Sequence, residues 1–354
     1  MPIEKLELER FRCLPKAKLE FDPCYNLLVG PNGAGKTSVL EAIYYLASGR
    51  SFRGTPDELL MQTGESQFVL CGQIRDALGI PALFGVAGTK GNREVRLDGK
   101  SIRSVSEFAR RFPVQVIDPE IHRLLEDGPA KRRRFIDWGV FHVEHAFHDA
   151  WRRFSRALLQ RNAAFKVKSS LSDIWESDIA AFGSLITGFR ESYLNDLRPF
   201  VASVGLQLLG QNVEFEFQRG WKQGVSLADA LKENRHKDEL RCLTSAGPHR
   251  AELVLKVDGA TSKDRVSRGQ QKLLACVLLL GQQLHRIAIG APMSCLLLDD
   301  PAAELDADNL GRLIDVIADL PVQLVVTALS SEGLDFLKTA KLFHVERGHV
   351  QAMA

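Results

Sequence analysis

Two segments far apart in the chain carry side chains that could bind and hydrolyse a nucleoside triphosphate. Lys36 and Thr37 close the first, which fits the phosphate-binding pattern GxxxxGK[ST]. Glycines in this pattern let backbone N–H groups turn toward phosphate oxygens, while Lys36 would reach the β- and γ-phosphates and Thr37 would hold Mg²⁺. The pattern therefore predicts a site for ATP and Mg²⁺. The whole motif is Gly30, Pro31, Asn32, Gly33, Ala34, Gly35, Lys36 and Thr37.

The second segment is an apolar run, residues 293–298, that ends in two carboxylates, Asp299 and Asp300. Burying charge is costly unless it meets a cation or a catalytic task, so paired aspartates at a strand end suggest a metal and a water. We expect Asp299 to bind Mg²⁺ through the hydration shell of the ion, and Asp300 to position and deprotonate the attacking water. Read alone, the pair could simply cap the next turn. The phosphate loop upstream favours the catalytic interpretation.

A third segment, Ser267-Arg268-Gly269-Gln270, stands between the other two. Ser267 lies at a plausible helix start, since residues 272–284 continue as a strongly apolar helix. Alone it would be an ordinary helix cap. Between a phosphate loop and an acidic strand it resembles the signature motif of ABC-type ATPases. That resemblance implies that Ser267 and Gly269 contact the γ-phosphate held by another protomer, and therefore a nucleotide-bound homodimer.

Strands and helices must position these segments. Residues 25–29 are expected to form a buried strand that runs into the phosphate loop, and residues 36–47 the helix after it. From Pro119 to about residue 210 the pattern becomes helical. Alternating apolar residues predict strands, largely antiparallel, at residues 3–11, 17–21, 68–74, 82–86 and 94–97, with a hairpin turn at Asp98-Gly99, and further strands at 114–117, 213–217, 252–257 and 324–327.

The predicted fold class is α/β: an ABC-type, P-loop ATPase head that is split in sequence, with an antiparallel β subdomain and an inserted short helical arm domain. The expected ranges are 1–118 for the first ATPase lobe, 119–210 for the arm, and 211–354 for the second lobe. A hairpin of roughly 90 helical residues would reach only about 65 to 70 Å. This length excludes the very long coiled coils of the structural-maintenance-of-chromosomes proteins.

The composition is that of an ordinary globular chain, with 354 residues of which 45% are hydrophobic and 25% charged. No apolar run approaches the roughly 20 residues of a membrane helix, and the first ten residues are too charged for a signal peptide. We therefore expect a cytoplasmic protein with no membrane partner. The six cysteines form no close pair, which argues against a zinc site or a disulfide framework.

The net charge of +2 does not by itself indicate a nucleic-acid partner, but the local charge is more informative. Residues 129–168 hold ten basic residues against three acidic ones. Such a stripe could follow a DNA phosphate backbone, and a solvated helix face is the alternative. The basic residues are Lys131, Arg132, Arg133, Arg134, Arg152, Arg153, Arg156, Arg161, Lys166 and Lys168.

Over essentially its whole length the chain resembles the RecF family of bacterial recombination mediators. The resemblance implies a DNA-repair ATPase that binds single-stranded, gapped or duplex DNA when ATP closes a dimer. It further implies that the protein helps RecO and RecR to load the recombinase RecA, and supports the SOS response. Beyond the ATPase motifs, the segments that carry the resemblance are Phe11-Arg12, residues 49–53, Pro119-Glu120, residues 128–138, residues 160–164, Gly247-Pro248-His249-Arg250, and Asp299-Asp300 with Glu304-Leu305-Asp306.

The resemblance also implies roles for two further residues. Gln115 resembles the glutamine that links the nucleotide to the helical part of these ATPases, where it would join Thr37 and Asp299 at the metal. Arg12 resembles an arginine that approaches the nucleotide phosphates in related heads. An ordinary strand glutamine and a surface arginine are the alternative interpretations.

The chain departs from the wider ABC pattern. Arg268 replaces the second glycine of the signature, and Asp300 replaces the usual glutamate. The strand at residues 324–327 is followed by Ala328-Leu329-Ser330, with no switch histidine. Because aspartate is one methylene shorter than glutamate, we hypothesise weak ATP hydrolysis that times DNA release.

Two other functions remain open. A nucleotide-binding subunit of a transporter is disfavoured because 231 positions separate Lys36 from Ser267, far more than in such subunits. A DNA-repair scaffold that does not hydrolyse ATP is disfavoured because Lys36, Thr37, Asp299 and Asp300 are intact.

Overall fold

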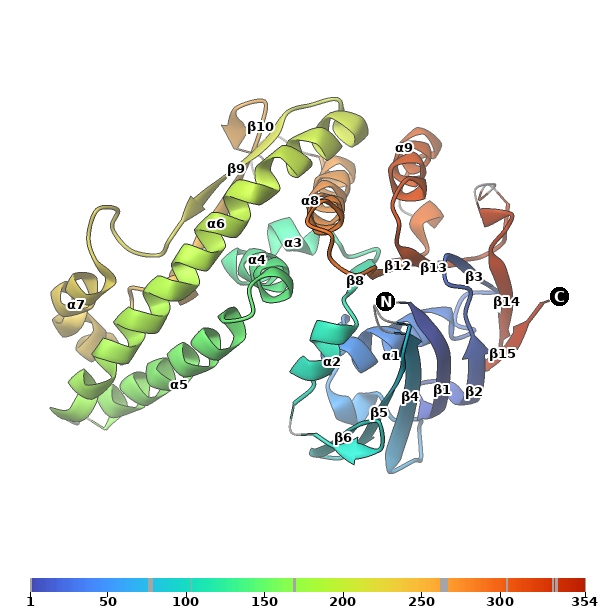
Figure 1. The fold of residues 1–354 in the computed structure, drawn as a ribbon, viewed down its shortest axis with the longest axis horizontal. Helices are drawn as coiled ribbons and strands as arrows, with labels where there is room; N and C mark the ends of the chain where they lie inside the picture. The colour runs from blue at the N-terminus through green and yellow to red at the C-terminus, as the bar shows by residue number, and fades with distance from the viewer. Residues whose placement is uncertain are drawn as a thin grey trace. The chain divides into compact units, whose positions relative to one another are not determined.

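The structure, a computed structural model, describes residues 2–75, 79–102, 104–167, 170–261, 267–303, 305–332, 334 and 337–353 (Figure 1). The chain divides into two compact units. The first joins residues 1–121 to residues 286–354, and the second contains residues 122–285. Residues 211–285, which we expected in the second ATPase lobe, therefore group with the helical segment.

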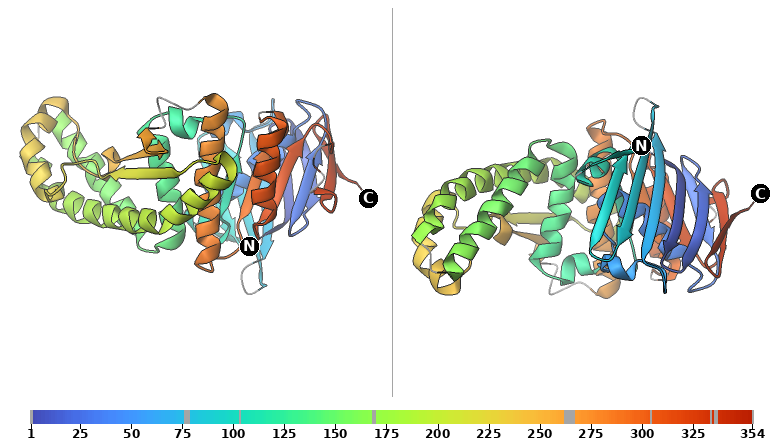
Figure 2. Two further views of the ribbon diagram at one scale, coloured as in Figure 1. Left: turned by 90° about the horizontal axis from the view of Figure 1, so that it is seen from above. Right: turned by 90° about the horizontal axis from the view of Figure 1, so that it is seen from below.

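One sheet of the first unit is antiparallel, with the strand order β2-β1-β4-β5-β6-β7. Figure 2 shows these strands side by side in blue to cyan. The expected hairpin turn joins β6 to β7, and its Asp98 and Gly99 both have positive φ angles, 50° and 79°, as a tight hairpin turn requires. The strands are β1 (Ile3–Phe11), β2 (Leu14–Glu20), β4 (Gln67–Arg75), β5 (Pro81–Thr89), β6 (Asn92–Leu97) and β7 (Lys100–Ser101).

The other six-stranded sheet has the order β15-β14-β3-β13-β12-β8, and all of its neighbours except β15 and β14 pair in parallel. β12 and β13 are buried at every position, as is usual for parallel strands covered on both faces. Only β13 separates β3, near the start of the chain, from β12, near its end. The strands are β3 (Tyr25–Val29), β8 (Val114–Ile117), β12 (Cys295–Asp299), β13 (Gln323–Ala328), β14 (Lys341–Glu346) and β15 (His349–Ala352).

Helix α1 (Lys36–Ser48) lies between the two sheets and contacts strands of both. Its Val39, Leu40 and Ile43 are fully buried in the core of the unit. The helix ends at Gly49, which has the left-handed φ of 68° that favours glycine at a helix end. The other helical segments of this unit are η1 (Asp57–Leu59), α2 (Ser106–Arg111), η5 (Pro301–Ala303) and α9 (Ala307–Ala318).

The second unit is mainly helical, and α6 (Glu176–Leu209) is its longest helix. At 34 residues, α6 is about 51 Å long. It packs against α4, α5, α7 and strand β9, and α4 packs against β10, so the small sheet β11-β10-β9 belongs to this unit. The remaining elements are α3 (Arg123–Glu126), α4 (Pro129–Val143), α5 (Phe147–Lys166), η2 (Ser170–Trp175), β9 (Val213–Gln218), α7 (Leu227–Arg241), η3 (Pro248–Arg250), β10 (Glu252–Val257), β11 (Ala260–Thr261) and most of α8 (Arg268–Ala288).

None of the helices in the described part of the chain combines the length and the apolar character needed to cross a lipid bilayer.

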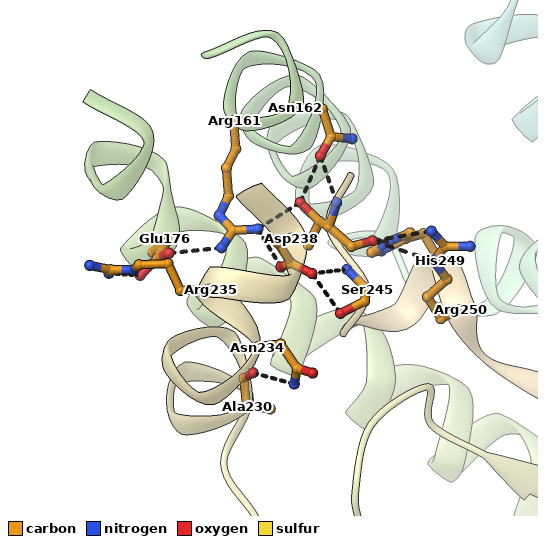
Figure 3. Close-up of polar contacts among 11 residues, drawn as sticks. Arg161, Asn162, Glu176, Ala230, Asn234, Arg235, Asp238, Ser245, His249 and Arg250 are labelled. Atoms are coloured by element: carbon orange, nitrogen blue, oxygen red, sulfur yellow. Dashed lines mark hydrogen bonds and ion pairs between the residues drawn. The ribbon is translucent and has the colours of Figure 1, made fainter. Parts of the chain in front are cut away.

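A buried ion-pair network joins α5, α6 and α7 (Figure 3). The guanidinium of Arg161, which is 0% exposed, donates to Asp238 at 2.8 Å, to Glu176 at 2.9 Å and to the hydroxyl of Thr244 at 2.8 Å. Asp238 also accepts hydrogen bonds from the backbone N–H and hydroxyl of Ser245. Two helices and the loop after α7 are therefore fixed to α5 through one arginine.

The basic residues between 129 and 168 do not form one solvated stripe. Arg161 is buried, Arg132 donates to both carboxylate oxygens of Glu252 at 2.8 Å, and Arg133 donates to a backbone carbonyl. The interpretation of all ten as a phosphate-binding stripe is wrong for these three, because internal acceptors occupy them. Arg134, Arg152, Arg153, Arg156 and Lys166 are exposed, and Lys168 lies outside the described residues.

Replacing Asp238 with alanine should leave the buried Arg161 without its most buried partner. Because breaking a buried ion pair is costly, and the N–H and hydroxyl of Ser245 also lose their acceptor, we expect the free energy of unfolding to fall by roughly 3–5 kcal/mol. Asp149→Ala is the matched control, since Asp149 is half exposed and pairs with the exposed Arg152 and Arg153. That change should cost less than about 1 kcal/mol. If urea denaturation shows the same loss of unfolding free energy for both variants, burial does not explain the cost of removing Asp238.

Candidate nucleotide-binding site

The predicted phosphate-binding loop connects β3 to α1 and forms one side of a cavity of about 290 Å³. Gly30 has a φ of 156°, and a Cβ atom there would lie 2.0 Å from the carbonyl oxygen of Val345 in β14. Only glycine lets the loop pass this close to the neighbouring strand. The cavity is lined by Cys13, Asn32, Gly33, Ala34, Gly35, Lys36, Thr37, Ser38, Arg53, Pro119, Asp299, Asp300 and Thr327.

Lys36 is held by the loop that it follows. Its ammonium donates to the carbonyl oxygens of Gly30 at 2.5 Å and Pro31 at 3.0 Å. Burial lowers the pKa of Lys36 from its usual value, and the nearby carboxylates of Asp300 and Asp299 act in the opposite direction. A phosphate would offer this ammonium charged acceptors, which make stronger hydrogen bonds than neutral carbonyls do.

Thr37 and Asp299 meet although 262 residues separate them along the chain. The hydroxyl oxygen of Thr37 lies 2.9 and 3.0 Å from the two carboxylate oxygens of Asp299. Thr327 of β13 donates a further hydrogen bond of 2.7 Å to Asp299. Hydroxyl and carboxylate oxygens are the ligands that Mg²⁺ prefers, and Mg²⁺ usually takes its remaining ligands from water and phosphate. The donor set at this position therefore fits Mg²⁺.

Asp300 lies in the same cavity but in a different environment. Its φ is 47°, and its backbone N–H donates to the Thr327 hydroxyl at 3.0 Å. Burial raises the pKa of the Asp300 carboxyl, Lys36 opposes this rise, and the charge of Asp299 adds to it. A carboxylate with a raised pKa is a better proton acceptor than an ordinary aspartate.

Gln115, which we expected at the metal, is not among the residues that line this cavity. It is buried and is the second residue of β8, where its register partner is Leu296 in β12. Asp299 lies three positions further along, or about 10 Å. The strand continues to Ile117, so Gln115 is inside the strand rather than at its end, and this placement gives no support to a metal role. Pro119 lines the cavity instead.

Arg12, which we expected near the phosphates, is also not among the lining residues. Its guanidinium donates to both carboxylate oxygens of Glu41 in α1, at 2.7 and 2.8 Å. Arg53 does line the cavity, and we did not select it from the sequence. Arg53 belongs to residues 49–53, one of the segments that carry the family resemblance. Membership of that segment was the sequence feature that could have identified it.

Ser267 and Gly269 lie in the second unit, and both are exposed. The Ser267 hydroxyl accepts a hydrogen bond from the backbone N–H of Gln270 at 3.4 Å, and the Gln270 side chain accepts one from the backbone N–H of Ser267 at 3.0 Å. This reciprocal pair is a capping box at the start of α8. The predicted helix start is therefore confirmed.

Comparison with known proteins decides the family. The model described as the RecF/RecN/SMC N terminal domain matches residues 2–351. The DNA replication and repair protein RecF of Vibrio parahaemolyticus is 35% identical over 358 residues, which cover 99% of this chain and 100% of that protein. The protein of the same name from Haemophilus influenzae is also 35% identical, over 100% of both chains. The chain belongs to the RecF family.

Solved structures place this RecF-family protein in the same fold as other RecF proteins. The recombination mediator protein RecF-ATPrS in the RecFOR pathway matches with a TM-score of 0.87 and 25% identity, covering 99% of this chain and 98% of that chain. An Smc head domain from Pyrococcus furiosus matches with a TM-score of 0.62 at 16% identity, which shows a shared fold alone. The expected ABC-type ATPase head is thereby confirmed. Family membership argues against a transporter subunit.

Replacing Asp300 with asparagine should stabilise the nucleotide-free protein at neutral pH. The folded state raises the pKa of Asp300 above its ordinary value of 3.8, so the ionisation of Asp300 disfavours folding increasingly as the pH rises above 3.8, and fully above the folded-state pKa. Asparagine removes this charge and tolerates a positive φ. The midpoint of urea unfolding should be higher for the variant at pH 7, and the difference should vanish as the pH falls below 3.8.

Asp306→Asn is a control of opposite sign. The backbone N–H of Asn309 lowers the pKa of Asp306, which caps α9. A lowered pKa contributes stability above the ordinary pKa, and this contribution is lost as the pH falls. The Asp306 variant should therefore be less stable than the wild type at pH 7. The assigned environment of Asp300 is wrong if its asparagine variant also lowers the midpoint at pH 7.

Proposed function

We propose that this RecF-family protein is an ATP-dependent DNA-binding recombination mediator. The observation that carries the proposal is the contact between Thr37 and Asp299 inside a phosphate-loop cavity that also holds Lys36 and Asp300. Related solved proteins are described as recombination mediators in the RecFOR pathway, one of them as RecF-ATP. These relatives support ATP as the nucleotide and RecO and RecR as partners.

ATP binding would use the loop, Lys36 and the pair of Thr37 and Asp299. The loop offers backbone N–H groups at the start of α1, where the helix also favours negative charge. Lys36 would exchange its carbonyl partners for the β- and γ-phosphates. Thr37 and Asp299 would hold Mg²⁺, which neutralises phosphate charge when it is bound. Arg53 would add a second cation at the rim of the same cavity.

Hydrolysis would use Asp300 as the proton acceptor. The oxygen of a water molecule bonds to the γ-phosphorus, its proton moves to the Asp300 carboxylate, and the bond from the γ-phosphorus to the bridging oxygen of ADP breaks. The raised pKa suits this role, but the short side chain limits how closely the carboxylate approaches the water. We therefore expect weak ATP hydrolysis.

A second copy of the chain would complete the site. Ser267 and Gly269 are exposed at the amino end of α8, where N–H groups and the helix dipole favour an anion. In the proposed homodimer, they contact the γ-phosphate bound by the other protomer. ATP then closes the dimer around DNA, and hydrolysis releases it.

DNA binding would depend on exposed cations, of which Arg152 and Arg153 pair with the half-exposed Asp149 rather than with a buried carboxylate. Arg152 is 74% exposed at its side chain and Arg153 59%, and Arg156 is also exposed on the same helix. Such residues contact phosphates, which give affinity but little sequence preference. The proposed targets are single-stranded, gapped or duplex DNA, at which the protein would help RecO and RecR to load RecA in repair and the SOS response.

The proposed dimer can be tested by sedimentation of the full chain with Mg²⁺ and ATP. The wild type should dimerise with ATP, Lys36→Ala should lose both ATP binding and the dimer, and Asp300→Asn should retain a dimer that keeps DNA. Ser267→Arg should bind ATP but stay monomeric, because only its contact with the second copy is blocked. Lys18→Ala removes an exposed lysine on β2 as a control. Single copies of the wild type at every concentration, even with a non-cleavable analogue, would refute the dimer.

The proposed DNA contacts can be tested by the salt dependence of binding. Changing Arg152 and Arg156 together to glutamine should weaken binding by about tenfold for every sequence. The slope of log affinity against log salt should fall by about 2, because two phosphate contacts are lost. Fluorescence anisotropy with gapped DNA at several salt concentrations measures both. Arg96→Gln is the control because Arg96 is also exposed, 59% at its side chain, but lies on β6. An unchanged slope would exclude Arg152 and Arg156 as contacts.

A further inference from the structure

A buried ion pair lies beside the phosphate cavity without lining it. Glu41 is 0% exposed and stands one helical turn after Thr37 in α1. Arg12, in the turn between β1 and β2, meets both of its carboxylate oxygens, at 2.7 and 2.8 Å. A buried carboxylate is unfavourable unless it is paired and hydrogen-bonded, and a bidentate arginine meets both conditions.

The remaining bonds of this ion pair go to the segment that follows α1. Arg12 donates to the hydroxyl of Thr55 at 2.8 Å and to the carbonyl oxygen of Leu59 at 3.1 Å. The hydroxyl of Ser51, which is also buried, donates to Glu41. Ser51 and Thr55 are therefore both tied to the same ion pair, four residues apart.

Arg53 is the residue midway between these two ties. Its backbone N–H donates to the Ser51 hydroxyl at 3.1 Å, and its side chain lines the phosphate cavity. Gly54, with a φ of 73°, forms the turn immediately after it. Because ordering a loop on binding costs conformational entropy, a loop that is already fixed on both sides presents its arginine to a ligand with less loss.

We infer that Arg12 and Glu41 are positioning residues that hold Arg53 at the phosphates of bound ATP. Arg12 thus acts on the nucleotide through the loop rather than by direct contact. The guanidinium of Arg53 offers a planar set of donors that suits phosphate oxygens, and the buried ion pair fixes the backbone from which it extends. The inference rests on the proposed ATP binding and adds a residue pair to it.

The simpler alternative is that the ion pair only stabilises the fold. A double-mutant cycle separates the two, because residues that act as one unit are not additive. Binding of a fluorescent ATP analogue with Mg²⁺ is measured for the wild-type full chain, Glu41→Gln, Arg53→Ala and the double variant. We expect each single change to weaken binding about tenfold, and the double change to weaken it no more than Arg53→Ala alone does. If the double variant instead binds about a hundredfold more weakly than the wild type, the two changes act independently and the inference is overturned.

Glu252→Gln is the matched control, because it breaks another bidentate arginine–glutamate pair, with Arg132 in the second unit. It should lower the unfolding midpoint and leave nucleotide affinity unchanged. If it weakens nucleotide binding as much as Glu41→Gln does, general destabilisation explains both effects and the inference is wrong.

Thr55→Val provides the second route if Glu41→Gln does not fold. It removes only the hydroxyl that accepts from Arg12, so the buried charges stay paired. Affinity should fall about threefold in the wild-type background and not at all when Arg53 is already alanine. An unchanged affinity in the wild-type background overturns the inference. If the wild type does not bind the analogue at all, the proposed function itself fails. That result differs from an additive cycle, in which the wild type binds and only the coupling is absent.

Discussion

The first unit depends on one constraint: the carboxylate of Asp299 must reach the hydroxyl of Thr37 across 262 positions of sequence. The parallel sheet satisfies it, because β3 and β12 are separated only by β13 and their carboxyl ends meet at one edge. The hydroxyl of Thr327, on the strand between them, donates a hydrogen bond to Asp299 and accepts one from the backbone N–H of Asp300. A slip of β12 by one residue would turn Asp299 to the other face of the sheet and remove the metal position, so the register of buried apolar strands sets the chemistry.

Buried arginine–carboxylate pairs fix the geometry in both units. Arg12 holds Glu41 beside the cavity, and Arg161 holds Asp238 within the helical unit. Such pairs add little net stability compared with apolar residues of equal volume, but breaking one is costly. Here each pair joins two segments that are distant in the sequence. Arg12 and Glu41 are 29 positions apart, and Arg161 and Asp238 are 77 positions apart. They also reduce the number of arginines available to DNA, which is why the exposed residues of α5 carry that proposal.

The sequence predicted what depends on local pattern. The phosphate loop, its flanking strand and helix, the capped start of α8 and the Asp98-Gly99 turn all follow from neighbours within a few residues, and the structure contains them. The strand at residues 114–117 was also predicted with its observed bounds, but the sequence could not show which of its neighbours line the cavity, and Gln115 is not among the lining residues. The sequence could not reveal that Arg161 points inward, because its acceptor Asp238 lies on a helix 77 residues later. The grouping of residues 211–285 with the arm depends on the packing of β9 against α6, which is also non-local.

The capped start of α8 explains how one phosphate could control the assembly of the proposed dimer. The Ser267 hydroxyl already accepts from the N–H of Gln270, yet a hydroxyl can donate its own proton at the same time. Contact with a γ-phosphate therefore requires no change in the helix cap. A hydrogen bond to a charged group is worth about 1.5–3 kcal/mol, and a symmetric dimer makes each contact twice. Loss of the γ-phosphate would then remove roughly 3–6 kcal/mol of association, a change on the order of 10²–10⁴ in affinity, from one serine per copy.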